Sequence, residues 1–329
     1  MRRSASPLSL VLLGLGVFLL VLAPLLAWYV EPRAKRTPID VESTTVLTGT
    51  GSYFDQQALK TRKGEKLTVT RRVLGNVAES DKHDVAVWDV SQTIDTPTTL
   101  KRDDPRKSFQ WTTERWVTDP RTNRPVHCCE ESPAPFAGEA YLKFPFDVEE
   151  RGYTWWDSTL GDTVPLRHTG RERVKGHEGL RFSGSVDPVR VGHRQVPGLL
   201  VDEPERGQVQ AEEWYANEDI DLVVDQRTGR LLRVSIAPRV TLRAPGGEKD
   251  AVTLLRSDKL EFTDATQREQ VRLAARDGRK LQLVGETAPL AGAAAGVPLA
   301  LSGAVLAARG RRPRRGTPGH AQNDETSGR

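Results

Sequence analysis

The sequence predicts a mainly β ectodomain of antiparallel sheets that is held at both ends by a transmembrane helix. Two uncharged runs, residues 8–29 and 288–308, lie near the two ends of the chain. Each is close to the ~20 residues that a helix needs to cross a bilayer. Between them, residues 31–287 contain short runs rich in β-branched and aromatic side chains, separated by turn signals, which is typical of antiparallel strands.

The first uncharged run resembles a signal peptide because arginines precede it, but it is longer than the ~7–15 apolar residues of a signal peptide. It ends in Trp28 and Tyr29, and these ring types are enriched at membrane interfaces. We therefore expect residues 8–29 to remain as an anchor, after a cytoplasmic N-terminus of residues 1–7.

The second run is mostly Ala and Gly, and a cluster of arginines follows it at once. Such clusters mark the cytoplasmic side of a spanning helix. Gly292 and Gly296 have a spacing that lets two helices approach closely, and the side of the first helix that carries Gly14 and Gly16 is one candidate partner. A span without a particular partner is the alternative. The tail, residues 309–329, is predicted to be disordered, basic and cytoplasmic.

The distribution of charge supports this orientation. The chain has 48 Lys and Arg against 44 Asp and Glu, and eight of the basic residues but only two of the acidic ones lie outside residues 31–287. The central body is therefore close to neutral, which argues against a nucleic-acid partner. Because the excess of positive charge flanks the two runs, we expect both termini in the cytoplasm, the body outside it, and the protein in the plasma membrane.

One strand of the body shows the alternation clearly. Leu67, Val69, Arg71 and Val73 occupy alternate positions, so they share one face of a strand. This alternation is typical of a β-strand.

The body also contains an internal echo. Residues 119–124 and residues 225–230 both begin with Asp, end with Arg, and follow aromatic runs. This favours two related units at about 40–130 and 150–245. Chance similarity is the alternative, since Asp, Asn and Gly are ordinary turn residues.

Residues 266–285 read as a helical stem that leads the chain back to the membrane. Thr266 and Glu269 have the spacing of a capping box. We expect the stem to be interrupted near Gly278.

Cys128 and Cys129 are the only cysteines, and they are adjacent. Three states are open: a vicinal disulfide, pairing with another chain, and two free thiols. An oxidising exterior favours the disulfide.

The sequence offers no catalytic, cofactor-binding or metal-binding motif. His127 and Glu130 flank the cysteines, but consecutive residues cannot easily point at one ion, and the usual ligand spacings are absent. No nucleophile motif accompanies the scattered histidines. We therefore expect a protein that is not an enzyme and that has no cofactor.

Six tryptophans lie in the body. Most are expected to anchor the sheet core, because large rings dominate burial. Trp155, Trp156 and Trp214 are the candidate contacts for an apolar ligand. The stretch from Val196 to Val201 is a further apolar patch, in a loop rich in Pro and Gly.

The segment between the two echoes carries a family resemblance. Its residues are Phe144-Pro145-Phe146, then Tyr153, then Trp156-Asp157, followed by Gly170-x-Glu172-x-Val174-x-Gly176. Together with the two spans, this pattern resembles the actinobacterial membrane-anchored family labelled PorA-type porin. The resemblance implies an envelope protein and supplies no catalytic residues.

These observations favour a non-enzymatic envelope protein whose ectodomain binds or passes an apolar molecule such as a lipid. Its topology is similar to that of the class B scavenger receptors, which are also tethered at both ends. A structural or assembly protein that binds other envelope proteins is the first alternative. A porin-type channel component is the second, and it would require oligomerisation, because two helices do not enclose a wide pore.

Overall fold

The computed structural model describes residues 7–56, 58–97, 99, 108–133 and 135–310. The chain divides into two compact units, one formed by residues 1–34 and 281–329 and the other by residues 35–280. The predicted cytoplasmic segments, residues 1–7 and 309–329, lie almost wholly outside the described residues.

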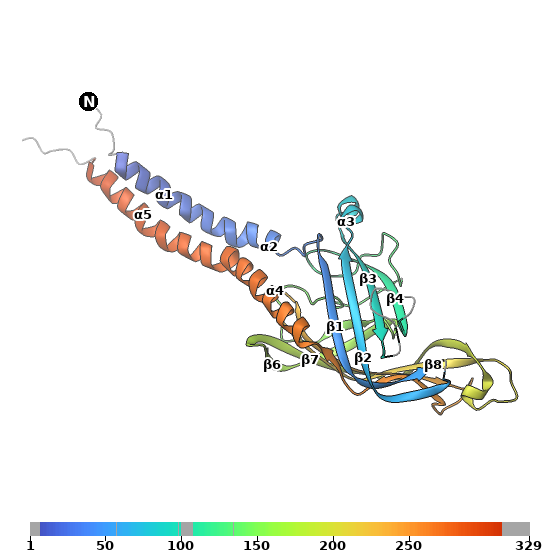
Figure 1. The fold of residues 1–329 in the computed structure, drawn as a ribbon. Helices are drawn as coiled ribbons and strands as arrows, with labels where there is room; N and C mark the ends of the chain where they lie inside the picture. Colours follow the sequence, from blue (N-terminus) through green and yellow to red (C-terminus); the bar gives the residue numbers. More distant parts are fainter. Residues whose placement is uncertain (1–6, 57, 98, 100–107, 134, 311–329) are drawn as a thin grey trace, which may run out of the picture. The chain divides into compact units, whose positions relative to one another are not determined.

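The first unit consists of two helical segments (Figure 1). One segment joins α1 (Pro7–Leu25), a π-helical turn (Leu26–Val30) and α2 (Glu31–Ala34), and the other joins a π-helical turn (Leu283–Thr287) and α5 (Ala288–Gly310). Both segments belong to helices that are long and apolar enough to cross a membrane. This confirms the two predicted helices.

The two helices pack closely through glycine. A Cβ added to Gly16 would lie 2.7 Å from the Cα atom of Ala300, and one added to Gly303 would lie 2.8 Å from the Cα atom of Leu13. Gly296 faces the Gly16 backbone, whereas Gly14 faces open space. Small residues therefore let the backbones of α1 and α5 approach directly.

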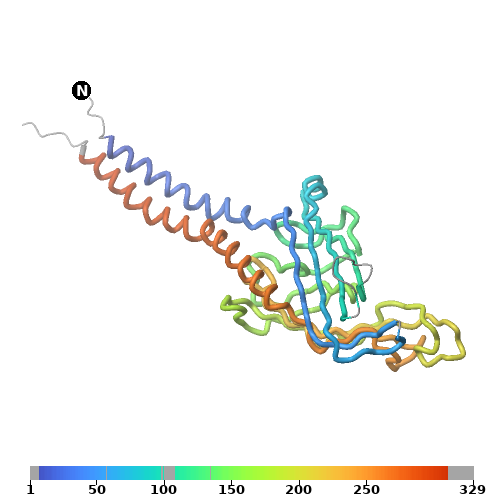
Figure 2. The backbone as a smooth tube through the Cα atoms, viewed as in Figure 1, coloured from blue at the N-terminus to red at the C-terminus, as the bar shows by residue number. Residues whose placement is uncertain are grey.

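The second unit is built on one antiparallel sheet, as the sequence predicts. Its described strands follow the order β4-β3-β2-β1-β10-β9-β8-β7-β6-β5, and β11 pairs with β1 and β9. Their bounds are β1 (Glu42–Asp55), β2 (Lys60–Gly75), β3 (Ala86–Asp95), β4 (Gln110–Thr118), β5 (Tyr153–Asp157), β6 (Asp162–Val174), β7 (His177–Val196), β8 (Val209–Val224), β9 (Leu231–Arg243), β10 (Val252–Ser257) and β11 (Leu260–Phe262). A short helix, α3 (Val77–His83), joins β2 to β3. Figure 2 shows the β1–β2 and β7–β8 hairpins, blue and yellow, extending to the same end of this unit.

The segment between β4 and β5 links the two edges of the sheet. Ser132 exchanges two backbone hydrogen bonds of 2.9 Å with Arg115 of β4. Further along, the carbonyl of Ala140 accepts a hydrogen bond of 2.9 Å from the N–H of Trp156 in β5. The sheet therefore bends round an interior that this segment helps to close.

The two echoed turns adopt the same conformation. The carboxylate of Asp119 accepts from the N–H of Thr122 at 2.7 Å, and that of Asp225 accepts from the N–H of Thr228 at 2.8 Å. Each turn then reaches a left-handed residue, Asn123 or Gly229. The shared turn agrees with the proposed duplication, which itself stays a prediction.

The interior holds two clusters of buried apolar residues. The larger one, here called the main cluster, draws on most strands and includes Leu47, Leu67, Val69, Phe144, Tyr153, Phe182, Tyr215 and Leu222. The smaller one, here called the aromatic cluster, consists of Ala86, Trp88, Val90, Trp116, Phe136, Tyr141 and Trp156. Phe136 and Tyr141 come from the linking segment, so its rings seal the interior between β4 and β5.

The stem forms α4 (Asp264–Gln282). The N-terminus is capped by Thr263, whose hydroxyl accepts from the N–H of Thr266 at 3.2 Å. The expected cap at Thr266 and Glu269 is thus displaced by three residues, because Thr263 lies between the end of β11 at Phe262 and the start of α4 at Asp264, where its side chain can cap the helix. The helix also continues through Gly278, since a single Gly costs a helix only ~1 kcal/mol.

Candidate functional site

Arg71 is a charged side chain on the interior face of the sheet. On β2 it lies between Val69, which belongs to the main cluster, and Val73, which packs against the aromatic cluster. Its Nε and Nη2 atoms donate to Gln92 Oε1 at 3.1 and 2.9 Å. Gln92 occupies the paired position on β3. It lies between Val90, which belongs to the aromatic cluster, and Ile94, which belongs to the main cluster.

Other polar side chains lie at this boundary. Glu114 of β4 accepts a hydrogen bond of 2.9 Å from the hydroxyl of Ser158. The Asp157 carboxylate accepts a hydrogen bond of 2.7 Å from the hydroxyl of Tyr215 on β8. The same hydroxyl accepts a hydrogen bond of 3.2 Å from the side-chain amide of Asn217. We call these side chains the interior polar layer: Arg71, Gln92, Glu114, Asp157, Ser158, Tyr215 and Asn217.

Most side chains of the layer are partly exposed although they face the interior, whereas Tyr215 and Asn217 are buried. Arg71, Gln92, Glu114 and Asp157 are each partly exposed, whereas Trp116, two positions from Glu114 on β4, is only 1% exposed. The boundary between the clusters is therefore a place where polar groups and solvent reach the interior.

Burial disfavours the charged forms of three ionisable side chains in the layer. Burial lowers the pKa of Arg71, against the attraction of Glu114 and Asp157. Burial raises the pKa of Glu114, against the hydrogen bond from Ser158 and the charge of Arg71. Tyr215 has a raised pKa through burial and the nearby Asp157 carboxylate. Each shift favours the neutral form, as expected for ionisable groups removed from water.

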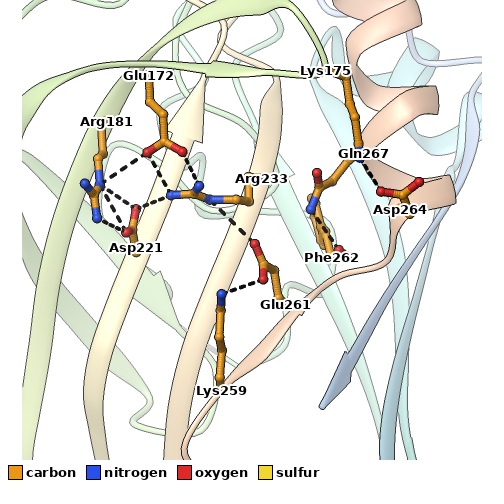
Figure 3. Close-up of polar contacts among 10 residues, drawn as sticks. All are labelled: Glu172, Lys175, Arg181, Asp221, Arg233, Lys259, Glu261, Phe262, Asp264 and Gln267. Carbon is orange, nitrogen blue, oxygen red and sulfur yellow. Dashed lines mark hydrogen bonds and ion pairs between the residues drawn. The ribbon is translucent and has the colours of Figure 1, made fainter.

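The partners of Arg71 differ from those of the arginines on the outer face. There, Arg181 and Arg233 alternate with Glu172 and Asp221 across β6 to β9, and Glu261 of β11 continues the row (Figure 3). Arg233 donates to Glu172 at 3.0 Å and to Asp221 at 3.2 Å. Arg71, in contrast, makes no ion pair with any described residue, and its hydrogen bonds go to an uncharged amide.

The comparison with known families assigns the chain. The family model described as Porin PorA matches residues 8–305. The chain belongs to this family. A comparison with curated proteins found no match.

In this Porin PorA family member, the Phe144-Pro145-Phe146 motif lies against the second echoed turn. The N–H of Phe144 donates to the carbonyl of Gly229 at 2.7 Å. Asn123 of the first echoed turn donates to the carbonyl of Lys143 at 2.8 Å. The motif therefore ties the two turns together beside the linking segment.

The three candidate tryptophans lie in different surroundings. Trp155 is partly buried against the main cluster, with its ring centroid 6.1 Å from that of Phe144. Trp156 belongs to the aromatic cluster. Trp214 lies apart from both: the Arg243 guanidinium stacks on it at 3.8 Å, and its indole donates to Glu212. Trp155 and Trp156 thus precede Asp157 of the interior polar layer on β5 and pack against different clusters, whereas Trp214 belongs to neither cluster.

Cys128 and Cys129 are joined to each other by a disulfide. Cys129 lines a polar surface pocket of about 370 Å³ with Lys82, His83, Arg115 and others. Arg115 pairs there with Asp89 and Glu130. Within the described ranges, no group of three or more His, Cys, Asp or Glu side chains is arranged to hold a metal ion.

Neither Arg71 nor its partners were identified as a site from the sequence. The alternation on β2 placed Arg71 on the apolar face, and the same signal exists on β3, where Gln92 falls between Val90 and Ile94. Glu114 and Asp157 carry no comparable local signal. They join the layer because the linking segment brings β4 and β5 together.

Proposed function

We propose that this protein is a membrane-anchored, non-enzymatic envelope protein whose β unit binds an amphipathic envelope molecule such as a lipid. The polar part of the ligand lies at the interior polar layer, and its apolar part lies along the main cluster. The observation that carries the proposal is Arg71, a cation between two apolar clusters that hydrogen-bonds only an amide among the described residues.

The cost of such an arrangement supports a binding role. Removing an arginine from water is unfavourable unless it is paired and hydrogen-bonded, and on the outer face Arg181 and Arg233 are paired with carboxylates. Ligand sites are mainly apolar with a few polar groups that fix orientation. The layer and the two clusters around it match that description.

The proposal is tested by native mass spectrometry of the full chain, purified in detergent from a lipid-rich actinobacterial host. Wild-type protein is expected to carry a stoichiometric lipid. Arg71→Gln is expected to lose at least about ten-fold in occupancy, which corresponds to ~1.4 kcal/mol. Arg72→Gln is the matched control, because Arg72 pairs with Glu42 on an exposed part of the same strand. Apo protein throughout, or equal occupancy in all three proteins, contradicts the proposal.

Binding of another envelope protein is the second candidate, and the β7–β8 connection favours it. The short helical turn Gly198–Val201 buries Val201 in the main cluster but leaves Leu199 71% exposed. A partner protein bound at this turn would cover the Leu199 side chain. Loss of a co-purifying protein in Leu199→Ser, with lipid occupancy unchanged, would support this role.

We further propose that both termini lie in the cytoplasm and that the β unit lies outside the plasma membrane. The arginines that flank the two runs support this orientation. Alkaline phosphatase fused to the C-terminus should be inactive, whereas activity there would reverse the assignment.

A further inference from the structure

We infer that the polar group bound at the interior polar layer is neutral and carries several hydroxyls, as a sugar or polyol does, and that it is not a phosphate. This inference rests on the function proposed above. It follows from the hydrogen-bonding groups that the layer leaves free and from the charges that it already holds.

The layer has several donors left to offer. Arg71 uses Nε and Nη2 on Gln92, and among the described residues nothing accepts from its Nη1 atom or from the amide nitrogen of Gln92. Beside the layer, the indole N–H groups of Trp116 and Trp156 are buried without a hydrogen bond to a described residue, although the Trp116 indole lies close enough to the Glu114 carboxyl group to lower its pKa. Unpaired buried donors cost ~1–3 kcal/mol each. A ligand that presents several acceptor oxygens would satisfy them.

The layer also offers acceptors. Glu114 accepts from Ser158 through Oε2 at 2.9 Å, and the Trp116 indole interacts with the same carboxyl group without forming a hydrogen bond. A hydroxyl both donates and accepts, so adjacent hydroxyls can accept from Arg71 or Gln92 and donate to Glu114. A phosphate oxygen supplies acceptors alone, unless it is protonated.

The charge of the layer opposes an anion. Asp157 accepts from the hydroxyl of Tyr215 and from the N–H groups of Thr159 and Leu160, which is the pattern of a satisfied carboxylate. Glu114 is a second carboxyl group close enough to interact with Arg71 and Asp157. One cation therefore faces two acidic groups. A phosphate would add negative charge to this set in a medium that screens it poorly, whereas a neutral polyol would not.

Trp155, on the same face of β5 as Asp157, packs against the main cluster, and Trp156, on the opposite face, belongs to the aromatic cluster. A sugar presents apolar C–H faces together with its hydroxyl edges, so it fits a site that combines rings with polar side chains. The apolar chains of a glycolipid would continue into the main cluster.

The test compares defined probes on the full chain in detergent, with native mass spectrometry as the readout. The probes are monoglucosyl dioleoylglycerol, dioleoyl phosphatidic acid and free methyl glucoside. The glucosyl lipid is expected to bind at least about ten-fold more tightly than phosphatidic acid. Free methyl glucoside binding as tightly as the glycolipid would support the same chemistry with a soluble saccharide as its source.

Variants locate the effect. Gln92→Leu and Trp156→Phe are each expected to reduce the preference for the glucosyl lipid at least about three-fold. Ser91→Ala is the control, because Ser91 pairs with Arg72 on the other face of β3. Trp156→Phe keeps a buried ring and removes only the indole, so it remains informative if Gln92→Leu folds poorly.

The two proposals fail in different ways. Phosphatidic acid binding as tightly as the glucosyl lipid, with both weakened by Arg71→Gln, would overturn the hydroxyl preference and leave the binding function standing. Absence of binding for every probe, or binding that Arg71→Gln leaves unchanged, would overturn both.

Discussion

Glu114 shows how the interior polar layer alters a single group. It lies on β4 beside the buried Trp116, and burial raises the pKa of its carboxyl group. A carboxyl group whose pKa is higher in the folded state binds its proton more tightly there than in the unfolded chain. Stability therefore falls as pH rises from the unfolded value of ~4.5 through the raised folded value.

Glu114→Gln should remove this loss. Because glutamine stays neutral, the melting temperature of the variant relative to wild type should increase as pH rises from 4.5 to 8. Thermal unfolding of the full chain in detergent measures the difference, and Glu130→Gln, at an exposed carboxylate that pairs with Arg115, is the control. A difference that stays constant over this range would show that Glu114 does not carry a raised pKa.

At this scale, the sequence reveals a residue where the local pattern is regular. Arg71 stands out because Leu67 and Val69 precede it on alternate positions. The tryptophans were less informative, since adjacent positions 155 and 156 reach different clusters and Trp214 packs under Arg243. The sequence shows where the tryptophans are, but the bend of the sheet determines which of them come into contact.

Among the elements, the outer row of ion pairs links four neighbouring strands and β11. Arg233 lies at its centre, with an 18% exposed side chain between Glu172 and Asp221. Removing it would leave Arg181 as the only described cation between Glu172 and Asp221, and Glu261 would lose its ion pair with Arg233. The strands β6, β8 and β9 would then lose a shared connection.

Arg233→Ala is therefore expected to destabilise the protein by about 1.5–3 kcal/mol, the range for hydrogen bonds to charged groups. Arg181→Ala, at a 44% exposed side chain, should cost about 1 kcal/mol or less, as is usual for exposed pairs. Denaturant unfolding of the two variants decides the matter. Equal losses would mean that the row does not depend on its central arginine.

The helix pair makes a second prediction at this scale. Gly16→Leu should separate α1 from α5, because its side chain would meet the Ala300 backbone, whereas Gly14→Leu enters open space. In detergent, the melting temperature of Gly16→Leu should fall by several degrees and that of Gly14→Leu should change little. Similar behaviour of both variants would contradict the packing of α1 against α5.

The elements themselves were largely predictable. The two apolar runs gave the helices, and alternation with turn residues gave the antiparallel strands. The helix cap was misplaced because Thr263 and Thr266 share the same chemistry, and position relative to β11 decides between them. The meeting of β4 with β5 was not predictable, since it depends on the irregular segment that contains Ser132 and Ala140.

At the scale of the whole molecule, the helical unit and the β unit have different characters. The helical unit has the length and apolar character of a membrane anchor, and the β unit holds the interior polar layer. The central claim is that an amphipathic ligand lies inside the β unit, apart from any lipid around the helices. A measurement that reports where the apolar chain lies tests this claim most directly.

That measurement is photolabelling of the full chain in detergent with diacyl lipids that carry a diazirine in one acyl chain, with either a glucosyl or a phosphate head. Labelled residues are then identified by peptide mass spectrometry. In the wild type, we expect labelling of interior residues such as Trp155. Arg71→Gln should lose this labelling, and Arg72→Gln should keep it. Labelling confined to α1 and α5, whichever head the lipid carries, would contradict the central claim.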